Sequence, residues 1–149
     1  MNSGLFSSVR QDWRTPKALM LQLESEFHFD FDPCPSNPFF DGLSVEWGAV
    51  NFVNPPYGRL IGRWIEKGYQ EYLSGKTVIF LIPSRTDTGW WHDYIMKATE
   101  IRFIRGRLHF DDSEKPAPFP SAIVVFTPSG GAGRPLLVVI ANKFGKGVF

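Results

Sequence analysis

The sequence predicts an α/β fold whose sheet is mostly parallel, with an antiparallel hairpin at one edge. In the first two thirds of the chain, short apolar runs alternate with stretches whose apolar residues recur at helical spacing, which is typical of alternating strands and helices. In the last third, apolar runs follow one another with only turns between them, which favours antiparallel pairing. At 149 residues, the chain is expected to form a single domain, residues 1–149, with a core of its own.

Two helices are expected in the first half of the chain. Thr15 can cap a helix and Pro16 suits a first helical position. Leucines then recur at helical spacing, which predicts a helix over 17–27. The same periodicity predicts a helix over 61–73, stopped by Gly75. A third, shorter helix is expected over 90–98.

The predicted strands are short apolar runs bounded by Pro, Gly, Asn or Asp. The run at 77–82 is apolar throughout, which fits a central strand buried on both faces. The others lie at 29–32, 50–53, 101–104, 107–110, 122–126 and 136–141. Loops are expected at 33–48 and 111–118, a turn or loose arm at 128–135, and flexible ends at 1–11 and 143–149.

Composition excludes several classes of protein. Sixteen Lys and Arg against 15 Asp and Glu give a net charge of +1, too low for a protein that coats or packages nucleic acid. The single cysteine, Cys34, excludes an internal disulfide and a cysteine-rich zinc framework. The three histidines lack metal-ligand spacing, so we predict no metal. The sequence has no long apolar span and no signal-peptide pattern, which predicts a soluble intracellular protein without a membrane partner.

One tetrapeptide carries the most chemical information. Asn54-Pro55-Pro56-Tyr57 directly follows the predicted strand 50–53, so it lies at the sheet edge where open α/β folds form their sites. Proline fixes φ and lacks an N–H, which leaves the carbonyls of Asn54 and Pro55 free to point outward. Acceptors beside an aromatic ring suit a planar group that bears an amine. The plainer alternative is a proline-stiffened turn.

This tetrapeptide resembles the catalytic motif of amino-group methyltransferases that use S-adenosylmethionine. The order of blocks along the chain further resembles the phage-type DNA adenine methyltransferases, the Dam-like family. The blocks, between Asp12 and Phe126, are Asp12-Trp13-Arg14-Thr15-Pro16, residues 29–35, 41–44 with Trp47, 77–83, 90–92, 106–110 and 118–122. The resemblance implies methyl transfer to the 6-amino group of adenine in double-stranded DNA, after the base flips out. For a phage-encoded protein it also implies action in the bacterial cytoplasm.

The resemblance also implies a set of site residues. The catalytic group would be Asn54, Pro55, Pro56 and Tyr57, with the acceptors holding the amine and the tyrosine ring stacking on the base. Cofactor contacts would come from Thr15, Pro16, Asp32, Pro33 and Cys34. Base-pocket or DNA contacts would come from Arg59, Arg105, Arg107, Phe110 and Phe119. Each has a structural alternative: a turn for Asp32, a helix cap for Thr15, solvated faces for the arginines and core packing for the phenylalanines.

The chain departs from larger amino-methyltransferases between Asp32 and Asn54. Only a loop joins these residues, where the larger enzymes have two further strand–helix units, and residues 32–36 contain no glycine. We therefore expect a trimmed Rossmann-like S-adenosylmethionine-dependent methyltransferase fold, with Asp41 as the candidate ribose ligand.

Alternative functions stay open on the sequence alone. The same motif could serve the 4-amino group of cytosine or a protein glutamine. The fold could also be a DNA-binding module that has lost its cofactor. No target-recognition domain is evident, so specificity is expected from loops 111–118 and 128–135 or from a second subunit in a homodimer.

Overall fold

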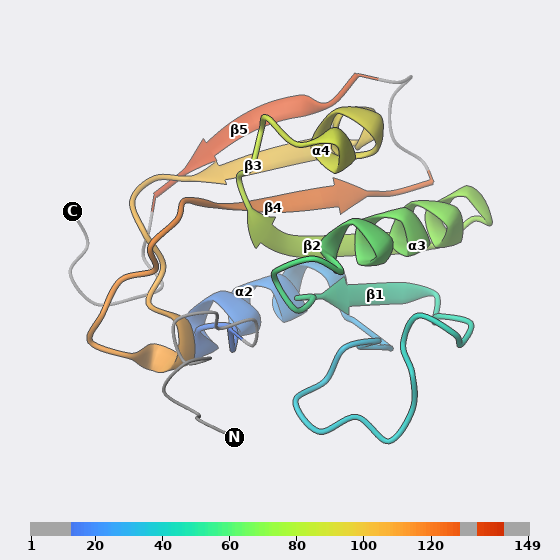
Figure 1. Ribbon diagram of the computed structural model, residues 1–149, viewed down its shortest axis with the longest axis horizontal. Helices are drawn as coiled ribbons and strands as arrows, with labels where there is room; N and C mark the ends of the chain where they lie inside the picture. Colours follow the sequence, from blue (N-terminus) through green and yellow to red (C-terminus); the bar gives the residue numbers. More distant parts are fainter. Residues whose placement is uncertain (1–12, 129–133, 142–149) are drawn as a thin grey trace.

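The computed structural model describes residues 13–128 and 134–141 (Figure 1). The expectations for residues 1–11 and 143–149, and for most of the arm at 128–135, lie outside the described residues. The described strands form one five-stranded sheet in the order β1-β2-β4-β3-β5. Their bounds are Val50–Val53 for β1, Thr77–Pro83 for β2, Glu100–Ile104 for β3, Ser121–Phe126 for β4 and Leu136–Ile140 for β5.

The sheet is mixed rather than mostly parallel. β1 pairs with β2, and β3 with β5, in parallel, whereas β4 is antiparallel to both β2 and β3. The antiparallel strand therefore lies in the centre of the sheet, and the predicted antiparallel hairpin at one edge is wrong. A central strand reads as a continuous apolar run whichever way it points, so the pattern could not reveal its direction.

Two of the three predicted helices have the predicted bounds. These are α2 (Lys17–Phe27) and α3 (Ile61–Leu73). The third is shorter than predicted, because α4 (Gly89–Asp93) ends at Asp93 with Tyr94 as its C-cap, and a separate 3₁₀ turn, η1 (Ile95–Lys97), follows. The Thr88 side chain caps α4 by accepting a hydrogen bond from the N–H of Trp91 at 3.2 Å.

The helices α2 and α3 cover opposite faces of the sheet. Phe80 of β2 lies against Gly68 of α3, so closely that a Cβ on Gly68 would come within 2.2 Å of the phenyl ring. Leu19 and Leu23 of α2 line a groove with Ile123 of β4. Because Ile123 precedes the cross-strand partner of Phe80, it points to the other face. Figure 1 shows the sheet between these helices.

Two predicted strands do not form. In the segment 29–32 only Phe31 makes a bridge, to Asn51, and the Asp30 carboxylate accepts a hydrogen bond from the N–H of Val50 at 3.1 Å. A side chain thus takes part of the pairing that a backbone ladder would provide. The segment 107–110 leads into a short 3₁₀ segment, η2 (Phe110–Asp112), within which Asp111 departs from helical geometry, and Asp111 and Asp112 adopt φ values of +60° and +54°. That left-handed backbone ends any strand.

None of the described helices is long and apolar enough to cross a bilayer. Among the described residues, no group of three or more His, Cys, Asp or Glu side chains is placed to hold a metal ion.

Candidate functional site

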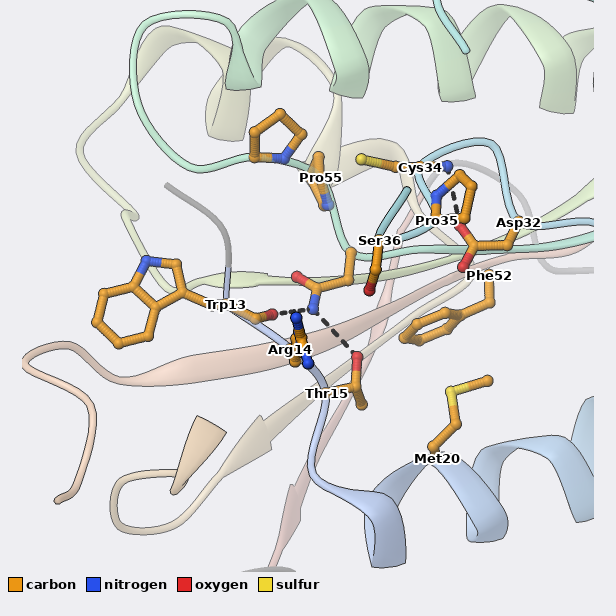
Figure 2. A pocket seen from close by; sticks show the side chains of 12 residues that line it. Trp13, Arg14, Thr15, Met20, Asp32, Cys34, Pro35, Ser36, Phe52 and Pro55 are labelled. Atoms are coloured by element: carbon orange, nitrogen blue, oxygen red, sulfur yellow. Dashed lines mark hydrogen bonds between the residues drawn. The ribbon is translucent and has the colours of Figure 1, made fainter. Parts of the chain in front are cut away.

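A cavity of about 400 Å³ lies where β1 ends, on the face of the sheet covered by α2 (Figure 2). Three chain segments far apart in the sequence form its walls: the approach to α2, the loop after Phe31, and the exit from β1. The lining residues are Trp13, Arg14, Thr15, Met20, Asp32, Cys34, Pro35, Ser36, Phe52, Asn54, Pro55 and Pro56.

The NH₂ group of the Asn54 side chain is hydrogen-bonded, whereas its oxygen has no partner among the described residues. Its Nδ2 donates to the backbone carbonyl of Trp13 and, at 3.0 Å, to Oγ1 of Thr15 (Figure 2). A carbonyl can only accept, so the NH₂ group must face Trp13 and Oδ1 must face away. This Oδ1 is buried and has no hydrogen-bond partner among the described residues. Such an atom is costly in a folded protein and calls for an explanation.

Asp32 lies on the opposite side of the cavity from Trp13 and Thr15, the two residues that accept hydrogen bonds from Asn54 (Figure 2). Burial of its carboxyl raises its pKa, and a hydrogen bond from the N–H of Cys34 partly offsets that effect. The bond, at 2.8 Å, also closes a turn that brings Cys34 to the cavity wall. Cys34 is half-buried and forms no disulfide with another described residue. Asp32 is an exposed residue overall, and a carboxylate on the wall of a cavity favours a positively charged ligand.

Tyr57 follows the two prolines, is buried, and is not among the residues that line the cavity. Its side chain is only 6% exposed, and its hydroxyl donates to the backbone carbonyl of Leu81 at 3.0 Å. Burial raises the pKa of the phenol well above its ordinary value, so the hydroxyl stays protonated as a donor at neutral pH.

Three other aromatic rings meet beside this tyrosine. The ring centroid of Tyr57 lies 5.5 Å from that of Phe119 and 6.2 Å from that of Phe110. Trp13 packs edge-on against both phenylalanines, at 5.2 and 5.5 Å. The structure therefore brings Tyr57, Phe110 and Phe119 together and adds Trp13, which was not among the predicted site residues.

The segment ahead of α2 is pinned to the turn that carries Phe110. The N–H of Arg14 donates to Oδ1 of Asp111 at 3.3 Å, and the N–H of Asp111 donates to the carbonyl of Arg14 at 2.9 Å. Asp111 makes both bonds from its positive-φ conformation. Backbone strain of this kind is often found at functional sites.

Thr15 does not cap α2, so that part of the prediction is wrong. The N-cap position is Pro16, and it makes no side-chain hydrogen bond. The hydroxyl of Thr15 is instead used to accept from Asn54. Pro16 and Pro33 are both buried, and neither is among the residues that line the cavity.

Asp41 is not brought to this cavity. Its carboxylate accepts from the N–H of Leu43 at 3.0 Å and from the hydroxyl of Ser44 at 2.7 Å. The bonds from Ser44 and then Leu43 lower its pKa. In the structure, Asp41 acts as the residue that closes an exposed turn.

The candidate DNA-contacting arginines lie on the surface. Arg59, Arg105 and Arg107 are exposed, and Arg107 also donates to the carbonyl of Ala117 at 3.3 Å. The nearby Arg102 makes ion pairs with Glu26 and Glu100. It ties β3 to α2.

Sequence reasoning missed several lining residues, although two had a usable signal. Met20 follows Pro16 by one helical turn, and Phe52 points to the same face of β1 as Asn54 by strand alternation. The carbonyl of Trp13 and the position of Ser36 had no such signal.

The fold and the pocket define an α/β protein with a buried amide acceptor at a strand end, unpaired among the residues that the structure describes, next to an aromatic cluster. The family model "DNA N-6-adenine-methyltransferase (Dam)" matches residues 2–128, and the chain belongs to this family. It is also 26% identical over 150 residues to the DNA N-6-adenine-methyltransferase of Haemophilus phage HP1 (strain HP1c1), covering 88% of this chain and 87% of that protein. No solved structure gives a significant match.

Proposed function

We propose that this chain transfers a methyl group from S-adenosylmethionine to the exocyclic 6-amino group of adenine in double-stranded DNA. The transfer would take place in the cavity at the end of β1, within a trimmed Rossmann-like methyltransferase fold. The buried, unpartnered Oδ1 of Asn54 is the observation that carries the proposal. The family membership and the phage relative support the same reaction.

The residues of the cavity fit the proposed cofactor. Asp32 would hold the positively charged methionine portion, because its carboxyl is partly desolvated and gains most from a cation. Phe52 and Met20 would supply the apolar wall, and Thr15 and Cys34 complete the lining. The cofactor, when bound, supplies an electrophilic methyl group on a sulfonium sulfur.

Asn54 and Pro55 would orient the amine for attack. Oδ1 of Asn54 and the carbonyl of Pro55 accept one hydrogen bond each from the two amine hydrogens. These bonds pull the nitrogen toward tetrahedral geometry and turn its lone pair to the methyl group. A nitrogen held in this way would be placed to take the methyl group that the cofactor supplies, which would leave S-adenosylhomocysteine, and the proton that the nitrogen gives up would pass to solvent water. Positioning and preorganised electrostatics lower the barrier, without a covalent enzyme intermediate.

Base capture would use the aromatic cluster of Trp13, Tyr57, Phe110 and Phe119. In the structure these rings touch one another, so a base that stacks on Tyr57 must displace at least one of them. We infer that Trp13 moves, because it is the least buried of the four rings. Arg59, Arg105 and Arg107 would contact phosphates, an interaction that weakens with added salt.

The test is methyl transfer by the purified protein from isotopically labelled S-adenosylmethionine to two synthetic duplexes. One contains all four bases, with the adenine in varied sequence contexts, and the other is alternating dG·dC. The products are digested to nucleosides and identified by mass spectrometry. We expect label in N6-methyladenine from the first duplex and none from the second.

Other outcomes identify the rival functions. Label in the dG·dC duplex would indicate the 4-amino group of cytosine as the acceptor. Label in protein only would indicate a glutamine substrate. Binding of duplex DNA with no binding of S-adenosylmethionine by calorimetry would indicate a module that has lost its cofactor. Each of these results contradicts the proposal.

A further inference from the structure

The hydroxyl of Thr15 has a partner that neither a helix cap nor a cofactor contact explains. Because α2 begins without a side-chain cap, this hydroxyl is not used to start the helix. Its Oγ1 lies 3.0 Å from Nδ2 of Asn54 and accepts a hydrogen bond from it. The two residues are 39 positions apart in the sequence, so the contact joins two separate walls of the cavity.

Two acceptors together fix the orientation of the Asn54 amide. Its NH₂ group has two hydrogens, and the carbonyl of Trp13 and Oγ1 of Thr15 take one each. The last torsion of an asparagine side chain is broad when nothing restrains it. With both hydrogens held, the amide plane is set, and Oδ1, which has no partner among the described residues, points away from the segment 13–15.

The acceptors are themselves held in place. Paired backbone and side-chain bonds join Arg14 to Asp111. A functional group held by a supported second layer of residues keeps the geometry that its chemistry requires.

We propose that Thr15 is a positioning residue for methyl transfer, acting through Asn54: its hydroxyl oxygen holds the amide so that Oδ1 meets the target amine. This inference rests on the proposed function, and it gives Thr15 a role separate from binding the cofactor. A residue that acts only by orienting Asn54 affects the chemical step more than it affects the affinity for either substrate.

The test uses Thr15→Val, which keeps the shape and removes the acceptor, and Thr15→Ser, which keeps the hydroxyl. Thr88→Val is the matched control, because it removes a threonine hydroxyl that caps α4, away from the cavity. The measurements are the single-turnover rate on an adenine-containing duplex and the dissociation constants for S-adenosylmethionine and for duplex DNA. Loss of one orienting hydrogen bond is expected to slow the Thr15→Val variant about tenfold or more.

We expect both dissociation constants of Thr15→Val to stay within about twofold of wild type, a difference too small to account for the rate. Thr15→Ser should recover most of the rate, and Thr88→Val should keep it. An unchanged rate in Thr15→Val would overturn the proposal. A loss confined to cofactor affinity would do so too, because it would make Thr15 a cofactor ligand. Failure of Thr15→Ser to recover would assign the effect to packing.

A second readout needs no activity. The side-chain amide hydrogens of Asn54, assigned by NMR in the protein without cofactor or DNA, should shift in Thr15→Val and return toward wild type in Thr15→Ser. If wild type transfers no methyl group but the resonances respond in this way, the proposed function fails and the contact stands. If transfer occurs and the resonances do not respond, the positioning role fails alone.

Discussion

The asparagines Asn51 and Asn54 lie three residues apart on β1 and its exit, yet their amides are in opposite situations. Asn51 is fully buried. Its Oδ1 accepts from the N–H of Gly48 at 2.9 Å, and its Nδ2 donates to the carbonyls of Gly48 and Thr77 at 2.9 and 3.0 Å. Asn54 donates both hydrogens but leaves its buried Oδ1 without a described partner. The first amide completes the fold, and the second keeps an acceptor available.

The same difference separates the two ends of the sheet. Near Asn51, the buried carboxylate of Glu71 binds Lys76 at 2.5 Å, Lys67 at 2.9 Å and the N–H of Trp47 at 3.3 Å. The buried side-chain atoms without a partner among the described residues all lie toward the opposite end, where β1 and β2 end and β4 begins. They are Oδ1 of Asn54 and the hydroxyls of Ser84 and Ser121.

This asymmetry shows how one strand can serve both stability and function. Unpaired buried polar atoms cost stability, so a protein concentrates them where a ligand can pair with them. The paired end offsets that cost. Substitutions at the paired end should therefore change the free energy of unfolding, and those at the unpaired end should change binding or rate.

A large effect on cofactor binding is expected at Asp32. Asp32→Asn keeps an oxygen that can accept from Cys34 but removes the charge, and we expect affinity for S-adenosylmethionine to fall about tenfold to a hundredfold. Burial raises the pKa of this carboxyl, so wild-type affinity should fall as pH drops through that raised value, and the variant should lack this dependence. The raised pKa also means that ionised Asp32 costs stability above its unfolded pKa, so the variant should be no less stable at pH 7. Calorimetry across pH measures the affinity, and an unchanged affinity would remove Asp32 from the site.

A smaller effect, on stability alone, is expected at Glu71. Burial raises the pKa of this carboxyl, but hydrogen bonds from Lys76, Lys67 and Trp47 outweigh burial and lower it. The ionised form thus stabilises the fold above the unfolded pKa, and the gain is lost as pH falls through the lowered value. Glu71→Gln should cost about 1–3 kcal/mol at pH 7 and less in acid. Urea unfolding at pH 7 and in acid measures the change in stability. A changed methyl-transfer rate per folded molecule would contradict the assignment of Glu71 to stability alone.

The smallest effect is expected for Tyr57→Phe. It removes the hydroxyl that donates to Leu81, which should cost about 1 kcal/mol of stability. The ring that would stack on the base remains, so methyl transfer should persist within a few-fold of wild type. Tyr57→Ala should weaken capture of the flipped base by about 1–3 kcal/mol. Thermal unfolding and methyl-transfer assays of both variants distinguish the contribution of the hydroxyl from that of the ring. Loss of activity in Tyr57→Phe would show that the hydroxyl acts directly in the reaction.

The sequence predicted the local elements well and the sheet direction poorly. Residues 17–27 and 61–73 were predictable because an apolar helical face repeats within the segment itself. The central place of β4 was not predictable, because strand order depends on contacts between distant segments. The predicted strand at 107–110 failed because nothing in its composition revealed the two left-handed aspartates that follow.

For the site, the sequence could predict which side chains gather but not which backbone groups hold them. Asp32 directly follows Phe31, and Asn54 directly follows β1. Because Phe31 pairs with Asn51 of β1, the two residues come out side by side and line the same cavity. The carbonyl of Trp13 is invisible to such reasoning, because every residue has one. Asp41 was chosen by its residue type, and its local turn takes up its carboxylate.

The most direct test of the account compares Asn51→Ala with Asn54→Ala in single-turnover methyl transfer and in urea unfolding. We predict that Asn54→Ala slows transfer about a hundredfold to a thousandfold, as loss of a preorganised partner does elsewhere, with little change in the free energy of unfolding. Asn51→Ala should lose about 2–4 kcal/mol of stability and keep the wild-type rate per folded molecule. Wild-type turnover in Asn54→Ala would contradict the account and leave Asn54 to Tyr57 as a stiff turn.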